Sequence, residues 1–545
     1  MAINPGHLNQ RISQRLFTLI LILTAILWIY SLFFVPTFDL DESLYRRVAE
    51  EIKRSGNWWQ PTWDHLPLYH KPPIFYWMIA LISRVVDGVQ APVSVFAARL
   101  PSFLASAGIL VSLYRFTRNI FAPSLFLCAV FPMLTATGVI FEPIQTLFLM
   151  PTLLLPAAAF LEERTLTIEE HLYIGLGMFL SSAFKGLNGL VLPTFAFGLH
   201  WLLFLKQFDL KQWFKPIWRF TLYAFLPATV LLFLYYSVLD AEMGRAFTRE
   251  FFLVHHLGRA RDPMESHGGS VFYQPLVLFF GGGFLTPFLL YQWMRIRPDY
   301  RQYCFPLTYA LAFLLVFTIT ATKLPHYIWP VWPALALMGA IFFELSGNLD
   351  DQQNERAIGR TAGFLASLPV FVLGALAIFT VFSPTFILNQ IELSQQARII
   401  VSYFTALSFF SRLSLVGAAI LCISFQSRRS YLTRHPMLTA SFGVGVSVLL
   451  GFGLLPTLNH LLVQPFEQIA QSVRERARPG DCIRYSGPHS PTLSIALGIE
   501  LIHNRCEPNL MKYLITPQWK EHECQERGMK IVDQKEYLLL CIKEK

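Results

Sequence analysis

Three carboxylates stand beside long apolar stretches of the chain, where they could take part in chemistry. Asp41 and Glu42 directly follow the first apolar stretch, and Glu142 lies between two later ones with Pro143 after it. A carboxylate just outside a membrane helix can act as a general base or stabilise charge. It can equally cap a short helix that starts near Ser43, because negative charge is favoured at a helix amino terminus. At Glu142 the charge is costly unless it faces water or a cavity.

Basic and aromatic side chains are the second group with chemical potential. Lys71 precedes two prolines that restrain the backbone, and Tyr76 and Trp77 follow. Its ammonium could bind one phosphate or snorkel toward lipid headgroups. Guanidinium groups farther along could bind a phosphate with two hydrogen bonds, or bind anionic headgroups without specificity. The further candidates are His255, His256, Arg259, Arg261, His267, Lys323 and Tyr327.

The composition indicates that membrane helices position these residues. Hydrophobic residues make up 54% of the 545 residues and charged residues only 14%, whereas soluble domains average about 25% charged residues. The mean hydropathy is +0.45, and apolar stretches of about 20 residues recur. We therefore expect an all-α polytopic membrane protein. The net charge of +9 does not indicate a nucleic-acid partner, because the Lys and Arg residues lie mostly in short segments between apolar stretches.

About 13 stretches are long enough to span a bilayer, allowing for tilt. They are 16–35, 96–116, 120–139, 144–161, 172–189, 190–205, 217–239, 271–294, 305–321, 328–345, 362–382, 401–425 and 437–455. The first is longer than the apolar region of a signal peptide and lacks a small-residue cleavage pattern, so we interpret it as a membrane helix. Segment 73–86 is short and contains Arg84, which favours an interfacial or re-entrant helix.

The distribution of basic residues predicts the topology. If segment 73–86 does not cross, the loops richest in Lys and Arg face the cytoplasm, and the short outer loops carry only Lys185, Lys323 and Arg398. Two longer loops, at about 36–95 and 240–270, then lie on the outer face. With the amino terminus in the cytoplasm, the odd number of spans also puts the carboxyl terminus outside. Residues 1–455 would form the transmembrane domain and residues 456–545 an outer domain.

The carboxyl-terminal 90 residues differ from the rest of the chain. Short apolar segments alternate with charged ones and with a helix-like segment, which predicts a small α/β domain. This tail contains Cys482, Cys506, Cys524 and Cys541. They could form two disulfides in an oxidising compartment, with three possible pairings, or be ordinary core residues. The absence of a CxxC spacing makes a zinc site improbable.

Four short motifs follow one another in the segments that we expect on the outer face. They are Asp41-Glu42-Ser-Leu-Tyr45, Gly56-Asn-Trp58 with Pro61, Lys71-Pro-Pro-Ile-Phe-Tyr76-Trp77, and Lys323-Leu-Pro-His-Tyr327-Ile-Trp-Pro330. In this order they resemble the C-type (GT-C) glycosyltransferases, in particular the bacterial enzymes that take a sugar from a polyprenyl phosphate. The pattern is closest to the lipid A 4-amino-4-deoxy-L-arabinose transferases, with protein-mannosyltransferase-like enzymes as further relatives. The chain has Leu44 where the closest relatives often have Arg, His70 where they tend to have Glu, and Glu142 where they tend to have Asp.

The resemblance implies roles for individual residues. Asp41 would be the principal catalytic carboxylate, with Glu42 and Glu142 as further catalytic acidic residues. The donor phosphate would be bound by Lys71, Arg259, Arg261, Lys323 and Tyr327. The substrate would be positioned by Tyr45, His70, Tyr76 and His267. No cofactor is identified from the sequence and no metal ligand is assigned, and a divalent metal held by His70 with His255 or His256 stays an open alternative to hydrogen bonding by these residues.

The expected reaction is transfer of a sugar from undecaprenyl phosphate, with inversion, at the periplasmic face of the bacterial inner membrane. Lipid A or lipopolysaccharide is the expected acceptor and 4-amino-4-deoxy-L-arabinose the candidate sugar. A protein or another glycan is the alternative acceptor. A lipid or sugar transporter is the alternative of another class. A transporter is expected to have two corresponding halves and charges at mid-membrane depth, whereas this chain places its acidic, basic and His residues in the outer loops.

Overall fold

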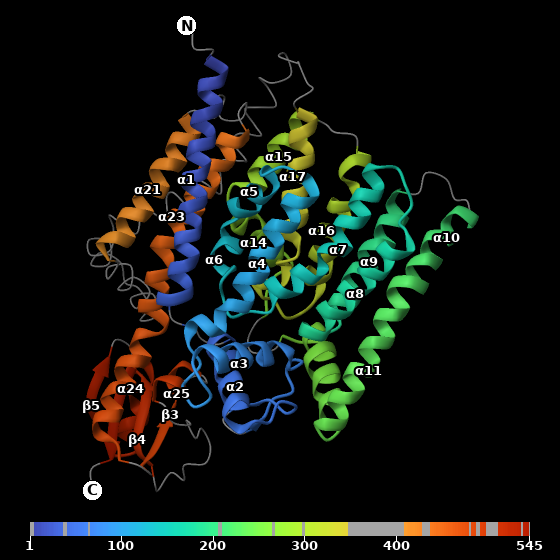
Figure 1. Ribbon diagram of the computed structural model, residues 1–545. Helices are drawn as coiled ribbons and strands as arrows, with labels where there is room; N and C mark the ends of the chain where they lie inside the picture. The colour runs from blue at the N-terminus through green and yellow to red at the C-terminus, as the bar shows by residue number, and fades with distance from the viewer. Residues whose placement is uncertain are drawn as a thin grey trace.

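The computed structural model describes residues 5–35, 37, 41–63, 66–204, 210–263, 268–296, 300–346, 408–427, 436–478, 481–486, 491–497, 511–535 and 538–543. Apolar helices stand side by side, and the polar helix α2, the short apolar helix α3 and a carboxyl-terminal sheet lie at one end of them (Figure 1). Leucine, phenylalanine and alanine side chains of many helices meet in one large apolar core. The polar end is therefore supported by a packed helical scaffold.

The long apolar helices fit a membrane protein. They are α1 (Pro5–Phe34), α4 (Val95–Thr117), α7 (Glu142–Leu161), α8 (Ile168–Lys185), α9 (Asn188–Phe204), α11 (Leu226–Glu242), α16 (Tyr300–Ile319), α17 (Val331–Ser346), α21 (Phe409–Ser427) and α23 (Pro436–Leu462). Helix α10 (Leu210–Phe220) and the π-helix η1 (Thr221–Phe225) lead into α11. Within the described residues, three helical stretches, Val95–Thr117, Glu142–Leu161 and Phe214–Glu242, are long and apolar enough to cross a membrane, and seven apolar helices are shorter. The expected span 362–382 lies outside the described residues, and the total of 13 stays a prediction.

Two stretches that the sequence predicts as continuous spans are each interrupted. Stretch 120–139 divides into α5 (Phe121–Cys128) and α6 (Val130–Thr135), and stretch 271–294 into α14 (Tyr273–Gly281) and α15 (Leu285–Ile296). The two breaks touch: a Cβ atom on Gly283 would lie 2.9 Å from the carbonyl oxygen of Cys128 and 2.8 Å from a methyl group of Val130. Gly283 also has a φ of +50°, which side chains disfavour. The glycine therefore permits both the turn and the close approach.

Two polar regions cover the end of the helices. The first contains α2 (Asp41–Ser55), the short strands β1 (Thr62–Trp63) and β2 (Leu66–Pro67), and α3 (Ile74–Val86). Lys53 fastens α2 to α3 and to the segment after it, through hydrogen bonds to Ser83 Oγ (2.8 Å) and the Ala91 carbonyl (2.6 Å). The second region contains α12 (Ala246–Thr248), the π-helix η2 (Arg249–Gly258) and α13 (Arg259–Arg261).

The segment between α16 and α17 is hydrogen-bonded to the second polar region. The 3-10 helix η3 (Pro325–Ile328) precedes α17. Just before it, the amides of Ala321 and Thr322 donate to the carbonyls of Ala260 and Arg259, at 3.1 and 3.2 Å. These backbone bonds bring Arg259 and the η3 segment together.

The carboxyl-terminal unit, from α24 to β6, is built on a mixed sheet of strand order β3-β4-β6-β5. Strands β3 and β4 are parallel, and the other pairs are antiparallel. Helices α24 and α25 share one apolar core with the sheet, while α26 lies over a second cluster. The elements are α24 (Gln464–Arg476), β3 (Cys482–Tyr485), α25 (Pro491–Leu497), β4 (Met511–Pro517), η4 (Gln518–Lys520), α26 (His522–Glu526), β5 (Met529–Lys535) and β6 (Leu538–Lys543).

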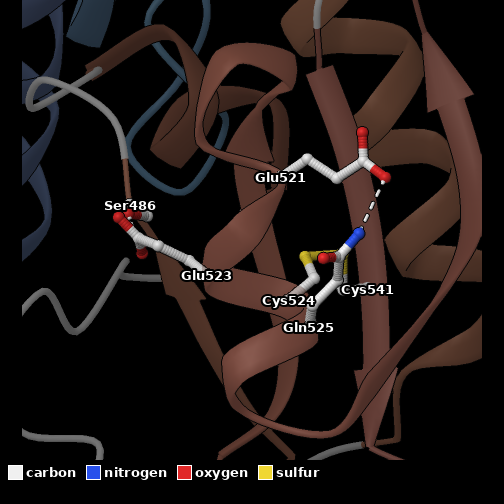
Figure 2. The surroundings of a disulfide bond; sticks show 6 residues. All are labelled: Ser486, Glu521, Glu523, Cys524, Gln525 and Cys541. Carbon is white, nitrogen blue, oxygen red and sulfur yellow. Dashed lines mark hydrogen bonds between the residues drawn. A yellow bond between two sulfur atoms is a disulfide. The ribbon is translucent and has the colours of Figure 1, made fainter.

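A disulfide closes this unit. Cys524 of α26 is bonded to Cys541 of β6, next to the Glu521–Gln525 hydrogen bond (Figure 2). Cys482 is also disulfide-bonded. Cys482, Cys524 and Cys541 are therefore disulfide-bonded rather than ordinary core cysteines. Cys128 and Cys422 are free and buried among apolar helices.

Replacing Gly283 with Ala should destabilise the protein, because the new methyl group would meet the Cys128 carbonyl and strain the backbone. Overpacking of this kind costs about 1–3 kcal/mol. We expect a lower unfolding temperature of the purified protein in detergent. Gly198→Ala in α9 is the matched control, since its Cβ would meet nothing within 4 Å. Equal unfolding temperatures for the two variants would contradict this account of the break.

Candidate active site

Asp41 is the first residue of α2 and is partly exposed. The hydroxyl of Tyr45, one turn later, donates to Asp41 Oδ1 at 3.1 Å. The Tyr45 ring is fixed by edge contacts with Phe75 and Phe141 at centroid distances of 5.9 and 4.9 Å. Burial and the nearby Asp41 raise the pKa of Tyr45 well above its usual value, so the phenol keeps its proton. One carboxylate oxygen is thus held while Asp41 stays accessible.

Glu42, the neighbour of Asp41, is buried and engaged. Its Oε2 accepts from Arg99 Nη2 at 2.8 Å, and its Oε1 accepts from the backbone amide of Val139 at 2.7 Å. Arg99, only 1% exposed, also donates to the carbonyls of Ser31 and Val35 at the end of α1, each at 2.6 Å. Glu42 therefore connects α1, α2, α4 and the segment before α7, which makes it a group that positions the site.

Glu142, the first residue of α7, is 3% exposed. Lys185, the last residue of α8, donates to Glu142 Oε1 at 2.5 Å, and His326 Nε2 lies 3.5 Å from the same oxygen. Neither residue was among the predicted site residues. The sequence contains one indication for Lys185: it is one of the few cations expected in the short outer loops, so it could have been predicted as a site residue. His326 could have been predicted from its position inside the fourth motif, between Lys323 and Tyr327.

The expected phosphate-binding residues Lys71, Arg259 and Tyr327 come together. Arg259 Nη1 donates to the Tyr327 hydroxyl at 3.1 Å, and the Lys185 ammonium lies 5.2 Å from the centre of the Tyr327 ring. Burial and the charges of Arg259 and Lys185 together lower the pKa of Lys71 to about 8, although Asp41 and Glu142 act in the opposite direction. Three cations and two carboxylates thus share one site, with a net charge of +1 that suits an anion.

Histidines form the rim of this cluster. The rings of His70 and His255 are 4.1 Å apart. His256 Nδ1 lies 2.9 Å from the carbonyl of Phe251, and its Nε2 accepts from the amide of Leu187 at 3.3 Å, which fixes one neutral tautomer. Burial, followed by neighbouring charges, lowers the pKa of His255 to about 3, and burial lowers that of His256 to about 4. Both are therefore neutral at pH 7 and can donate or accept hydrogen bonds.

Other predicted site residues have different surroundings. The Lys323 ammonium donates to the carbonyls of Phe317, Thr318 and Thr320, at 3.3, 2.5 and 2.5 Å, so its three protons cap the end of α16. Arg261 is exposed, and His267 lies outside the described residues. Tyr76 is fully buried with its ring 5.8 Å from that of Tyr45. Its hydroxyl has no hydrogen-bond partner among the described residues.

Metal binding was left open from the sequence. Among the described residues, no group of three or more His, Cys, Asp or Glu side chains could hold a metal ion. The His70–His255 pair is close enough to share a ligand, but it provides only two donors.

Comparisons with known proteins agree with this architecture. No protein-family model matches the chain. The structure resembles crystal structures of ArnT from Cupriavidus metallidurans, including one bound to undecaprenyl phosphate, with a TM-score of 0.71, 17% identity and coverage of 96% of this chain and 97% of that one. In sequence the chain is 23% identical to the undecaprenyl phosphate-α-4-amino-4-deoxy-L-arabinose arabinosyl transferase of Yersinia enterocolitica over 355 residues, 61% of each chain. The same-named protein of Erwinia tasmaniensis is 23% identical over 65% of this chain and 64% of its own length.

The chain therefore shares the fold of ArnT, and its sequence is similar to those of proteins named as undecaprenyl phosphate-α-4-amino-4-deoxy-L-arabinose arabinosyl transferases. The chain spans about three-fifths of the length of these named relatives. An uncharacterised protein of Aquifex aeolicus is 25% identical over 68% of this chain and 71% of its own length.

Breaking the Glu42–Arg99 pair should destabilise the protein strongly, because either single change leaves a buried polar or charged group without its partner. Such losses cost about 3–5 kcal/mol. We expect Glu42→Gln and Arg99→Met each to lower the unfolding temperature in detergent. The double variant should recover part of the loss.

The control is Glu162→Gln. Glu162 pairs with Arg164, but its side chain is 60% exposed, so its loss should cost less than about 1 kcal/mol. Strictly additive losses in the double variant would rule out the coupling between Glu42 and Arg99.

Proposed function

We propose that this enzyme transfers a sugar from undecaprenyl phosphate to lipid A or lipopolysaccharide at the periplasmic face of the bacterial inner membrane. The observation that carries the proposal is the Glu142–Lys185 ion pair, together with the Arg259–Tyr327 hydrogen bond and the electrostatic interaction of Lys71 with Arg259, Lys185, Asp41 and Glu142. A 4-amino-4-deoxy-L-arabinose donor is favoured by the names of the sequence relatives.

The charge balance of the site fits the leaving group. A sugar–phosphate diester carries one negative charge, which the net charge of +1 in the site matches. When the bond between the sugar carbon and the phosphate oxygen breaks, its electron pair stays on the phosphate and adds a second negative charge. Cations that are already in place stabilise this charge more in the transition state than in the ground state, which is the condition for catalysis. Lys71, Arg259 and the Tyr327 hydroxyl are the groups proposed to contact that phosphate.

Asp41 is proposed to act on the acceptor. The acceptor oxygen would attack the anomeric carbon from the side opposite the phosphate, which inverts the configuration. A hydroxyl acceptor would give its proton to Asp41, whereas a phosphate acceptor would need little base assistance. Glu142 already accepts from Lys185, so we assign it the task of orienting that ammonium. Tyr45 would orient Asp41, and the Tyr76 hydroxyl, which has no partner among the described residues, would donate to the substrate.

The periplasmic location is supported by the disulfides of the carboxyl-terminal unit. This unit and the site lie at the same end of the helices (Figure 1). Disulfides such as Cys524–Cys541 form and persist in oxidising compartments. The end of the molecule that carries Asp41 would therefore face the periplasm, where lipid A is exposed.

Donor binding should weaken at alkaline pH, since the Lys71 pKa is about 8. The ammonium is formed below that pH and lost above it. If phosphate binding requires it, the KM for the donor should rise roughly tenfold by pH 9. Lys71→Arg, which stays charged, should keep a low KM to higher pH. A pH series of donor KM for the two enzymes tests this, and identical alkaline limbs would exclude Lys71 as the titrating group.

Asp41→Asn should abolish sugar transfer while leaving donor binding in place. The test is mass spectrometry of lipid A and surface glycans from cells that lack the protein, complemented with wild type, Asp41→Asn or the exposed control Glu162→Gln. Wild type and control should restore one sugar-sized mass, and its position identifies the acceptor.

Restoration of that mass by Asp41→Asn would refute the catalytic assignment. A restored mass on a protein or on another glycan would keep the chemistry and replace lipid A as the acceptor. Unchanged glycans in every strain would refute the proposed transfer.

A further inference from the structure

The carboxyl-terminal unit touches the helix that carries Asp41. Ser43, two residues after Asp41, is fully buried, and its Oγ lies 3.0 Å from the Oγ1 of Thr492 in the first turn of α25. Thr492 is itself only 5% exposed. This hydroxyl pair joins residues 449 positions apart. It is a direct link between the sheet unit and the first turn of α2.

The same turn is enclosed by further polar contacts. Ser43 Oγ also lies within hydrogen-bond distance of the carbonyl and the hydroxyl oxygens of Thr37, at 3.2 and 3.1 Å, and its single proton can go to one of them. Arg46 Nε donates to the Val93 carbonyl at 2.6 Å, and its Nη1 lies 3.5 Å from Thr37 Oγ1. On the side of the carboxyl-terminal unit, the Glu467 carboxylate of α24 interacts electrostatically with Arg46. Two helices of the unit, α24 and α25, thus interact with the beginning of α2.

Three supports hold this turn, and they come from different parts of the chain. Arg99 of α4 holds Glu42, the aromatic rings of Phe75 and Phe141 hold Tyr45, and Thr492 holds Ser43. Asp41 itself is partly exposed. Its placement against the cations therefore depends on the orientation of the turn, and Thr492 is the support that the carboxyl-terminal unit supplies through a buried hydrogen bond.

We propose that the carboxyl-terminal unit is a positioning part of the active site, with Thr492 as the positioning residue that orients Asp41 through Ser43. The inference rests on the proposed function, in which Asp41 acts on the acceptor. Loss of the Thr492 hydroxyl would leave Ser43 with one support fewer and let the first turn of α2 shift. A misplacement of about 1 Å of a reacting group can reduce a rate by about a hundredfold, so even a fraction of that shift is measurable.

The test compares three full-length variants in lipid nanodiscs. Thr492→Val removes the hydroxyl and keeps the shape, Thr492→Ser keeps the hydroxyl, and Thr516→Val is the matched control. Thr516 is a fully buried residue of β4 whose hydroxyl has no partner among the described residues. We expect Thr492→Val to lower kcat about tenfold with little change in donor KM. The serine variant and the control should stay within about twofold of wild type.

Hydrogen exchange gives a second readout that a general loss of stability would not produce. The amides of residues 42–46 should exchange faster in Thr492→Val than in wild type, and unchanged in Thr516→Val. Ser43→Ala removes the same contact from the α2 side, so it tests the inference if Thr492→Val does not fold. The double variant Ser43→Ala/Thr492→Val should then be no slower than the slower single variant.

The inference is overturned if Thr492→Val has wild-type kcat, or if Thr516→Val loses as much activity. It is also overturned if Thr492→Ser fails to restore kcat. Asp41→Asn, assayed in parallel, separates the two proposals. If Asp41→Asn is inactive and Thr492→Val is unaffected, only the positioning role fails. If Asp41→Asn is active, the proposed function fails whatever Thr492→Val does.

Discussion

The geometry of the site depends on one buried ion pair. A guanidinium that is almost completely enclosed, as that of Arg99 is, must find partners, because an unpaired charge in an apolar interior is very costly. Arg99 finds Glu42 on one side and the final carbonyls of α1 on the other. Glu42 uses its second oxygen on the Val139 amide, three residues before Glu142. Both acidic positions of the site are therefore set by the same carboxylate, and the separation between them is fixed before any substrate binds.

The cations illustrate a different constraint. Like charges placed together repel, and the pKa of Lys71 is lowered first by burial and then by the charges of Arg259 and Lys185. The protein tolerates this because Glu142 compensates Lys185, and the Tyr327 ring lies beneath the Lys185 ammonium. A phosphate would relieve the remaining excess of positive charge. The stability that the site lacks when empty is thus available as binding energy for an anion.

The sequence indicated which residues belong to the candidate site, but not the buried hydrogen bonds and ion pairs that position them. Asp41, Lys71 and Tyr327 of the motifs and Arg259 of the second outer loop lie in one cluster, because loops at one end of a helix bundle converge when the helices pack, and the roles assigned to them stay predictions. Lys323 belongs to a motif too, yet it caps α16. Its backbone partners are a local feature that residue types do not reveal. Arg99 was missed because an arginine inside an apolar stretch is indistinguishable from an interfacial one until its partner, 57 positions away, is known.

The fold was predicted at the level of class and not of detail. Hydropathy identified the apolar helices, but it treats a broken helix and a continuous one alike, so it could not locate the breaks at Ala129 and Gly283. These breaks depend on which backbone lies opposite, and that is a property of tertiary packing.

The junction between α23 and α24 determines how the sheet unit can move. Val463 alone separates the two helices, and its carbonyl accepts from the amides of both Phe466 and Glu467. A domain on a flexible tether samples a volume set by the length of its linker. Here there is no linker, so the unit is a fixed wall beside α2 rather than a tethered lid. In the proposed reaction, an acceptor that approaches Asp41 from the side of this unit would have to pass around the wall, so the sheet unit would act as a size filter for acceptors.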